Sequence, residues 1–230
     1  MGSLFRTAAA LTRTRDVLNK FVPIFGKKDY ELDYWKSRFA VEGALTGSHY
    51  QNFYTEVFGL TTHDFEGKRM LDIGCGPRGS LEWADNALER VGLDPLADEY
   101  LKLGASRHRM KYIAAPSEQI PFEDGHFEVV ASFNSLDHVD DLSRTIREIK
   151  RVTATNGLFL LMVEINHLPT PTEPLTLGEN LLEVFAPEFS LQRSWTVALR
   201  HDHDLYRSVL DKKLSIPGTP AILCGRFLRT

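Results

Sequence analysis

The stretch Arg69-Met70-Leu71-Asp72-Ile73-Gly74-Cys75-Gly76-Pro77-Arg78-Gly79 decides the fold of this chain. Its first five residues predict a buried strand, and the glycines that follow allow a tight turn whose backbone approaches a ligand closely. We expect a helix to open after this turn, over residues 79–88. The glycine spacing also fits the G-x-G-x-x-G pattern of dinucleotide-binding proteins, which is a weak signal by itself.

Short apolar runs and helical stretches alternate after this motif. Strands are predicted at 90–93, 111–114, 127–133 and 157–164, with helices at 96–104 and 140–152. Such alternation is typical of a parallel sheet with helices on both faces. A loop with three prolines follows, then a helix at 177–185 and strands at 189–199 and 220–228. The sequence therefore predicts an α/β fold with a mostly parallel seven-stranded sheet that ends in an antiparallel hairpin.

Residues 1–60 differ in composition from the rest. Residues 1–28 are basic, with apolar residues at helical spacing, and residues 30–60 are rich in aromatic rings, with a helix break expected near Gly43–Gly47. We predict an N-terminal helical cap over 1–60 ahead of a domain over 61–230. Rings of residues 30–54 either roof a small-molecule pocket or serve packing alone. For residues 1–28, contact with a membrane surface or a targeting role is a less favoured alternative.

Charge and cysteine content exclude several classes of function. The chain has 27 Lys and Arg residues against 31 Asp and Glu residues, a net charge of -4, which argues against a nucleic-acid partner. Two cysteines, Cys75 and Cys224, form no disulfide framework, so we expect a reducing, cytoplasmic location. No run approaches the roughly 20 apolar residues that span a bilayer. The oligomeric state has no signature in the sequence.

Two acidic residues at predicted strand ends point to a nucleoside cofactor. Asp94 follows Gly74 by twenty residues, the distance at which a carboxylate meets ribose hydroxyls in adenosine-containing cofactors. Asp72 lies just before the glycine turn, where it would repel the pyrophosphate of a nicotinamide cofactor. It would attract the ammonium and sulfonium groups of S-adenosylmethionine (SAM). In the alternative interpretation, Asp72 only hydrogen-bonds the glycine turn.

Residues 67–165 resemble the SAM-dependent methyltransferases of the Rossmann-like class, in their type 11-like small-molecule branch. Five blocks match in order: Arg69–Gly79, Val91–Asp94, Ala115–Val130, Asn134–Asp141 and Arg147–Leu161. The resemblance implies SAM as cofactor, S-adenosylhomocysteine as product, and a site formed by Asp72, Gly74, Cys75, Gly76, Asp94, Pro95, Ser117, Glu118, Asn134 and Leu136. One departure is Pro116, which replaces an adenine-contacting Asp of many members and leaves adenine recognition to Ser117 and Glu118.

Methyl transfer is an in-line displacement, so the enzyme must chiefly hold acceptor, methyl and sulfur in a row. A base is needed only where the acceptor loses a proton. Ligands of parallel sheets lie beyond the carboxyl ends of the strands, which makes Asn134, Asp137, His138, Glu164 and His167 candidates. Of these, we expect His138 and Glu164 to be catalytic. Asn134-Ser135-Leu136-Asp137 replaces the motif typical of methylation at exocyclic base amines, so a small molecule methylated at oxygen or carbon is favoured over nitrogen.

The run His201-Asp202-His203-Asp204 looks like a metal site, yet consecutive residues of an extended segment point to opposite faces. We therefore expect no metal, and interpret the run as a solvated loop or a lid. Two other functions stay open at this stage: a nicotinamide-dependent oxidoreductase that uses the same glycines, and a catalytically silent SAM-binding protein.

Overall fold

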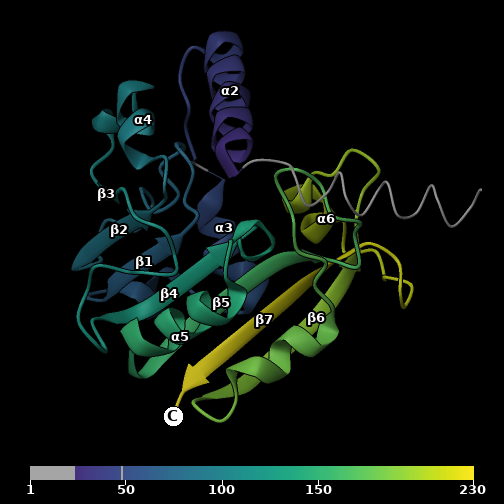
Figure 1. Ribbon diagram of the computed structural model, residues 1–230. Coiled ribbons are helices and arrows are strands. Elements are labelled where there is room, and N and C mark those ends of the chain that lie inside the picture. Colours follow the sequence, from purple (N-terminus) through teal and green to yellow (C-terminus); the bar gives the residue numbers. More distant parts are fainter. Residues whose placement is uncertain (1–23, 48) are drawn as a thin grey trace, which may run out of the picture.

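The computed structural model of the chain describes residues 24–47 and 49–230 (Figure 1). Its centre is a seven-stranded sheet in the order β3-β2-β1-β4-β5-β7-β6. Five strands are parallel: β1 (Arg69–Ile73), β2 (Glu89–Leu93), β3 (Lys111–Ile113), β4 (Phe127–Phe133) and β5 (Thr153–Ile165). Strands β6 (Phe189–Ala198) and β7 (Ala221–Arg229) pair antiparallel, and β7 also runs antiparallel to β5. The predicted α/β architecture and terminal hairpin are confirmed.

Each face of the sheet has its own apolar layer. One face is covered by helix α5 (Leu142–Val152) and the 3-10 helix η5 (Glu179–Phe185), whose Phe185 packs on Phe159 and Phe227. The other face is covered by α3 (Tyr50–Tyr54), α6 (Leu205–Asp211) and the 3-10 helices η1 (Glu56–Phe58) and η2 (Thr62–Phe65). Parallel strands covered on both faces are expected to be apolar throughout, as in the fully buried run 159–163 of β5.

The predicted helices at 96–104 and 140–152 are present as α4 (Ala97–Lys102) and α5. Helix α5 begins where the Asp141 side chain accepts a hydrogen bond from the Arg144 backbone nitrogen at 2.9 Å. Short 3-10 helices η3 (Ala105–Arg107) and η4 (Leu136–His138) follow α4 and β4. The segment predicted as a helix at 177–185 is the 3-10 helix η5.

The helix predicted at 79–88 is wrong. Residues 74–88 connect β1 to β2 through successive turns, with backbone hydrogen bonds such as Ala84 N to Leu81 O at 3.2 Å. Leu81 and Ala84 are buried at a spacing that a helix would also give. The Glu82 carboxylate fixes this segment to residues 109–110, because it accepts hydrogen bonds from the backbone nitrogens of Arg109 and Met110. These contacts stabilise the turns in place of a helix.

Strand β5 begins earlier than predicted, at Thr153, directly after α5. Asn156 adopts the left-handed conformation with φ 61°, and the β4–β5 register shifts between Phe127 and Val129. The Asn156-Gly157 pair is therefore an irregularity within the strand.

The N-terminal segment is described from residue 24 onward, so the predictions for 1–23 lie outside the described residues. Helix α2 (Ile24–Glu42) ends before Gly43, and α3 begins at Tyr50, which confirms the predicted break. In Figure 1, α2 stands beside α4, far from the C-terminus, and its Leu32 and Trp35 pack against the small cluster of Leu96, Tyr100 and Ala105. Residues 50–58 pack into the sheet's own apolar layer, and the division at residue 60 stays a prediction. None of the helices that the structure describes is long and apolar enough to cross a membrane.

Candidate functional site

Two hollows meet at the carboxyl ends of the parallel strands, where ligands of such sheets bind. The inner cavity is lined by Gly74 after β1, Asp94 after β2 and Asn134 after β4, with Lys27, Lys28 and Glu31 of α2 above them. The outer cleft, of about 1010 Å³, is lined by Asp72, Gly76, Arg78 and Phe133 and by residues of α2, α3 and α6. Gly74, Asn134, His138 and Glu31 border both hollows, so one elongated ligand can reach from one into the other.

The glycine turn brings the β1 backbone against β2. Gly74 and Gly76 have φ values of 71° and 56°, which side chains other than glycine rarely adopt. Gly74 N donates to Leu93 O at 2.8 Å, and Gly76 N donates to Asp94 Oδ2 at 3.3 Å. Because no helix follows this turn, the site lacks the helix N-terminus that holds a pyrophosphate in dinucleotide-binding proteins.

Asp72 is a buried carboxylate that lines the outer cleft. It accepts a hydrogen bond from the Ser80 hydroxyl, and no Lys or Arg of the described residues forms an ion pair with it. Burial raises the pKa of Asp72 to about 7, despite the hydrogen bond from Ser80. The local environment would favour its charged form only when a cation approaches.

Asp94 is the first residue after β2, two positions beyond Gly92, which pairs with Asp72. Its Oδ1 accepts a hydrogen bond from Leu96 N at 2.8 Å, and its Oδ2 faces Gly76 N. Burial raises the pKa of Asp94 to about 7, although the bonds from Leu96 and Gly76 oppose the shift. The carboxylate is oriented by the backbone and faces the inner cavity.

The remaining residues expected to bind the cofactor divide into two groups. Pro95, Ser117 and Glu118 line the inner cavity, and Cys75 lines the outer cleft. The side chains of two of them already have partners: Ser117 Oγ lies 2.9 Å from Thr145 Oγ1, and Glu118 Oε1 accepts from the backbone of Asp140 at 2.9 Å. Leu136 borders neither hollow and is fully buried in the apolar layer beneath.

Asn134 stands between the two hollows in the left-handed conformation, with φ 55°. Its backbone nitrogen donates to Met162 O at 2.7 Å, which fixes the turn after β4. Its side-chain oxygen Oδ1 is buried and has no hydrogen-bond partner among the described residues. It is therefore a free acceptor for a donor group on a ligand.

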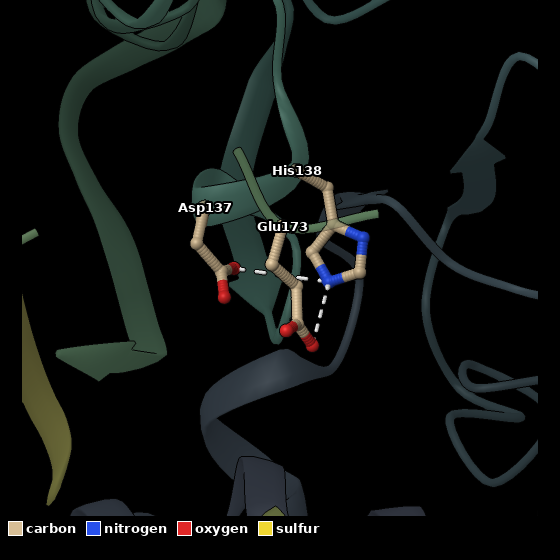
Figure 2. A group of neighbouring side chains, drawn as sticks. All are labelled: Asp137, His138 and Glu173. Carbon is tan, nitrogen blue, oxygen red and sulfur yellow. Dashed lines mark ion pairs between the residues drawn. The ribbon is translucent and has the colours of Figure 1, made fainter. Parts of the chain in front are cut away.

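Three carboxylates surround His138 where the cleft and the cavity meet, and Figure 2 shows two of them, Asp137 and Glu173. Its Nε2 lies 3.9 Å from Asp137 Oδ1 and 3.9 Å from Glu173 Oε1, and its Nδ1 lies 3.8 Å from Glu31 Oε2. Burial lowers the pKa of His138, but Glu31, Asp137 and Glu173 together raise it above its ordinary value. The sequence singled out Asp137 and His138, but not Glu173, because a carboxylate in a proline-rich loop has no distinctive spacing.

Glu164 and His167 lie near the Asp137–His138–Glu173 group but line neither hollow. Glu164 is buried, borders neither hollow, and has Oε2 at 3.7 Å from Nδ1 of His203. Burial and the nearby Glu173 and Asp137 raise the pKa of Glu164. His167 Nε2 lies 3.5 Å from Asp137 Oδ2, and this contact raises the pKa of His167 to about 9.

Asp202 and Asp204 of the run His201–Asp204 each form a separate structural contact. Asp202 pairs with Arg200 at 3.0 Å, and Asp204 begins α6 by accepting from Arg207 N at 3.0 Å. Asp202, His203 and Asp204 line the outer cleft, so the segment occupies the place of a lid, a role that stays a prediction.

Aromatic side chains form one wall of the outer cleft. They come from α2 and α3, namely Tyr30, Tyr34, Trp35, Tyr50 and Phe53, together with Tyr206 of α6. Arg78 fastens α2 over the glycine turn, because its guanidinium pairs with both oxygens of Glu42 at 2.8 Å and stacks on Trp35 at 5.5 Å. Rings of residues 30–54 therefore border the cleft, which agrees with the first of the two interpretations of this segment.

Comparison with known proteins gives a family for the strand–turn core. Residues 71–161 match the model of a family described as a methyltransferase domain. Sterol 4-C-methyltransferase strm-1 of Caenorhabditis elegans is 33% identical over 104 residues, which cover 42% of this chain and 31% of that protein. The chloroplastic tocopherol O-methyltransferase of Arabidopsis thaliana is 29% identical over 103 residues, 41% of this chain and 30% of that protein. The matched stretch thus spans about a third of each relative.

Solved structures share the fold over a longer stretch. The cyclase SpnF superposes with a TM-score of 0.54 at 22% identity, over 71% of this chain and 75% of that one. A SAM-dependent methyltransferase of Mesorhizobium loti superposes with a TM-score of 0.54 at 16% identity, over 72% of this chain and 92% of that one. At these identities the superpositions establish a shared Rossmann-like fold alone.

Proposed function

We propose that this chain is a SAM-dependent methyltransferase of the type 11 class and that it methylates a small molecule at an oxygen or carbon atom. In this reaction the acceptor atom attacks the methyl carbon of SAM from the side opposite the sulfur. The carbon–sulfur bond breaks as the new bond forms, and its electron pair stays on sulfur as the neutral thioether S-adenosylhomocysteine. The enzyme's main contribution is alignment of the three atoms.

The observation that carries the proposal is the pair of buried carboxylates at neighbouring strand ends. Asp94 faces the inner cavity and can accept hydrogen bonds from both hydroxyls of a ribose, and Asp72 offers negative charge at the start of the outer cleft. SAM requires both features, since it joins an adenosine to a methionine with positive ammonium and sulfonium groups. The free Oδ1 of Asn134, which borders both hollows, suits a hydrogen bond from the ammonium.

The outer cleft suits an apolar acceptor with a polar end. Its aromatic wall offers ring faces, and the Asp137–His138–Glu173 group stands at its inner border. The two curated relatives named above carry the names of a sterol and a tocopherol methyltransferase, both of which concern largely apolar molecules. We propose an acceptor of this class, in the size range of a few rings.

Loss of a proton by such an acceptor would be assisted by the Asp137–His138–Glu173 group. His138 borders the cleft and keeps the catalytic assignment made from the sequence. Glu164 borders neither hollow, so we assign it a positioning role in which its charge acts on the imidazoles nearby.

Calorimetric titration of the purified chain with SAM, S-adenosylhomocysteine and NAD tests the proposal directly. We expect SAM and S-adenosylhomocysteine to bind in the micromolar range and NAD not to bind. A chain that binds NAD and ignores SAM would instead be an oxidoreductase. Mass spectrometry after incubation with labelled SAM and a panel of phenols and sterols then identifies the acceptor by the mass of one added methyl group.

A silent SAM-binding protein is the second candidate. The cyclase SpnF shares this fold, and a fold alone does not fix the reaction. SAM binding without methyl transfer to any member of the panel would favour this alternative.

A further inference from the structure

Asp137 is a carboxylate without a partner in the interior. Its side chain is fully buried, and neither Oδ1 nor Oδ2 has a hydrogen-bond partner among the described residues. A buried carboxylate in that state is costly unless a proton or a cation compensates it. The position therefore suits a positively charged group, because the described residues offer this carboxylate two imidazoles at 3.5–3.9 Å but no hydrogen bond.

Further donor atoms face the same point. The Nε2 of His138 lies 3.9 Å from both Asp137 Oδ1 and Glu173 Oε1, and the three ligand atoms lie within 4.8 Å of one another (Figure 2). This Nε2 is buried and lacks a hydrogen-bond partner in the described part of the chain. The imidazole of His138 and the carboxylates of Asp137 and Glu173 thus place potential ligand atoms around one point.

His167 adds a fourth donor on the other oxygen of Asp137. Its Nδ1 lies 3.0 Å from the carbonyl oxygen of Leu168, a contact that requires the proton on Nδ1. Its Nε2 lies 3.5 Å from Asp137 Oδ2, so this nitrogen is within reach of an ion that Asp137 binds.

We propose that Asp137, His138 and Glu173 bind a divalent transition-metal ion, with His167 as a further ligand or as the group that orients Asp137. Imidazole and carboxylate ligands together suit zinc, manganese or iron. Ligand atoms about 2.0–2.2 Å from such an ion lie roughly 3–4 Å from one another. The 3.9 Å from His138 Nε2 to each carboxylate and the 3.5 Å from His167 to Asp137 fit that range, and the atoms of Asp137, His138 and Glu173 all lie within 4.8 Å of one another.

The location gives the ion a role, which rests on the proposed function. His138 and Glu173 border the outer cleft, so an open coordination position would face the acceptor. An acceptor hydroxyl bound there would lose its proton more readily, because the metal lowers its pKa. His138 would then act as a ligand, and the proton would pass to solvent through the cleft.

Metal binding is measured without SAM or acceptor, so that its outcome does not depend on the proposed function. The full-length chain, stripped with a chelator, is titrated with Zn²⁺ alone by calorimetry at pH 7.5. We expect one ion per chain with a dissociation constant below 10 µM. Asp137→Asn, His138→Gln and Glu173→Gln each change a ligand with little change of shape, and we expect each to weaken binding at least tenfold.

His126→Gln is the matched control, since His126 also pairs with a carboxylate, Glu89 at 2.8 Å, but lies away from both hollows. We expect it to bind Zn²⁺ as the unaltered chain does. Glu173 belongs to a loop and is partly exposed, so Glu173→Gln tests the site even where the substitution at buried Asp137 disturbs folding.

A dissociation constant above 100 µM for the unaltered chain would overturn the proposal, as would Zn²⁺ binding that Glu173→Gln and His138→Gln leave unchanged. SAM titration of the same metal-free preparations separates the two hypotheses. Failure to bind SAM counts against the methyltransferase proposal alone, whereas failure to bind Zn²⁺ counts against the metal site alone.

Discussion

Ser135 lies so close to Gly74 that a Cβ atom on Gly74 would come within 2.3 Å of the Ser135 Cβ. The Ser135 hydroxyl donates to the carbonyl oxygen of Ile73 at 2.8 Å and lies 2.6 Å from the Ser132 hydroxyl. The turn after β1 and the turn after β4 are therefore interlocked, with no room for a methyl group between them. This contact sets how far apart the strand ends stand at the border of the inner cavity.

The contact predicts that Gly74→Ala is far more destabilising than the same change at another glycine of similar conformation. Gly43, with φ 72°, has nothing within 4 Å of its Cβ position, so Gly43→Ala meets backbone strain alone, about 1–2 kcal/mol. Gly74→Ala adds a steric clash worth about 1–3 kcal/mol. Urea denaturation of both variants measures the difference, and equal losses would contradict the interlocked turns.

The strands could be predicted because a buried parallel sheet needs continuous apolar runs between turn-forming residues. The runs that predicted β1 and β4 end where those strands end, at Ile73 and Phe133. The helix predicted over 79–88 was wrong because Leu81 and Ala84 are buried at a spacing that occurs in turns as well as in helices. Contacts of the Glu82 side chain with residues 109–110 decide between them, and no local pattern reveals such a tertiary contact.

Some residues of the candidate site could likewise be predicted from the sequence, and others could not. Asp72 and Asp94 were predictable, because their distance from the glycine turn along the chain fixes their place at the strand ends. The meeting of Glu173 with His138 was not, since it depends on the path of a loop that has no periodic pattern. The part played by Glu31 depends likewise on the way α2 packs across the strand ends.

Asp94→Ala should weaken SAM binding at least a hundredfold. The substitution removes two hydrogen bonds from ribose hydroxyls to a charged acceptor, each worth about 1.5–3 kcal/mol. It also frees Gly76 N and Leu96 N, which the carboxylate now holds. Calorimetry gives the dissociation constant, and Asp98→Ala, at an exposed position in the first turn of α4, is the control. A loss of less than tenfold would contradict the ribose contact.

SAM binding should weaken as the pH falls from 8 to 6. The pKa of Asp72 is raised to about 7 by burial, and a cationic ligand favours the carboxylate. Above pH 7 the carboxylate is already present. Below pH 7 a proton must leave on binding, which costs up to about tenfold in affinity per pH unit. Asp94, whose pKa is also raised to about 7, adds to the same trend.

Asp72→Asn isolates the contribution of Asp72 to this pH dependence. The amide keeps the shape but has no negative charge, so SAM should bind more weakly at pH 8 and its affinity should vary less between pH 8 and pH 6. Comparison of the two proteins also cancels the titration of SAM itself. Tighter SAM binding by Asp72→Asn, or a wild-type affinity that is constant from pH 6 to 8, would show that Asp72 does not face a positive group.

Glu42→Gln should loosen the aromatic wall of the outer cleft. The Glu42 carboxylate pairs with both terminal nitrogens of Arg78 and thereby holds the end of α2 over the glycine turn, and this pairing lowers the pKa of Glu42. Without the charge we expect the acceptor KM to rise about threefold to tenfold. Asp33→Asn is the control, because Asp33 is exposed on the same helix and, among residues 24–47 and 49–230, forms an ion pair with Lys36 alone, at 3.5 Å. Equal KM values in all three proteins would contradict a tethering role.

Glu164→Gln should affect methyl transfer less than His138→Gln, although the sequence presents both residues as catalytic. Glu164 is buried behind the cleft and borders neither hollow, whereas His138 borders both. A group that acts only through the charge it adds to its neighbours is expected to change kcat by less than about tenfold, or roughly 1.4 kcal/mol of activation free energy. We expect a larger loss for His138→Gln, because His138 lines the cleft proposed to hold the acceptor. Single-turnover rates at saturating SAM, with whichever acceptor the panel identifies, measure both. A greater loss for Glu164→Gln would mean that the buried carboxylate, rather than the imidazole, acts on the acceptor.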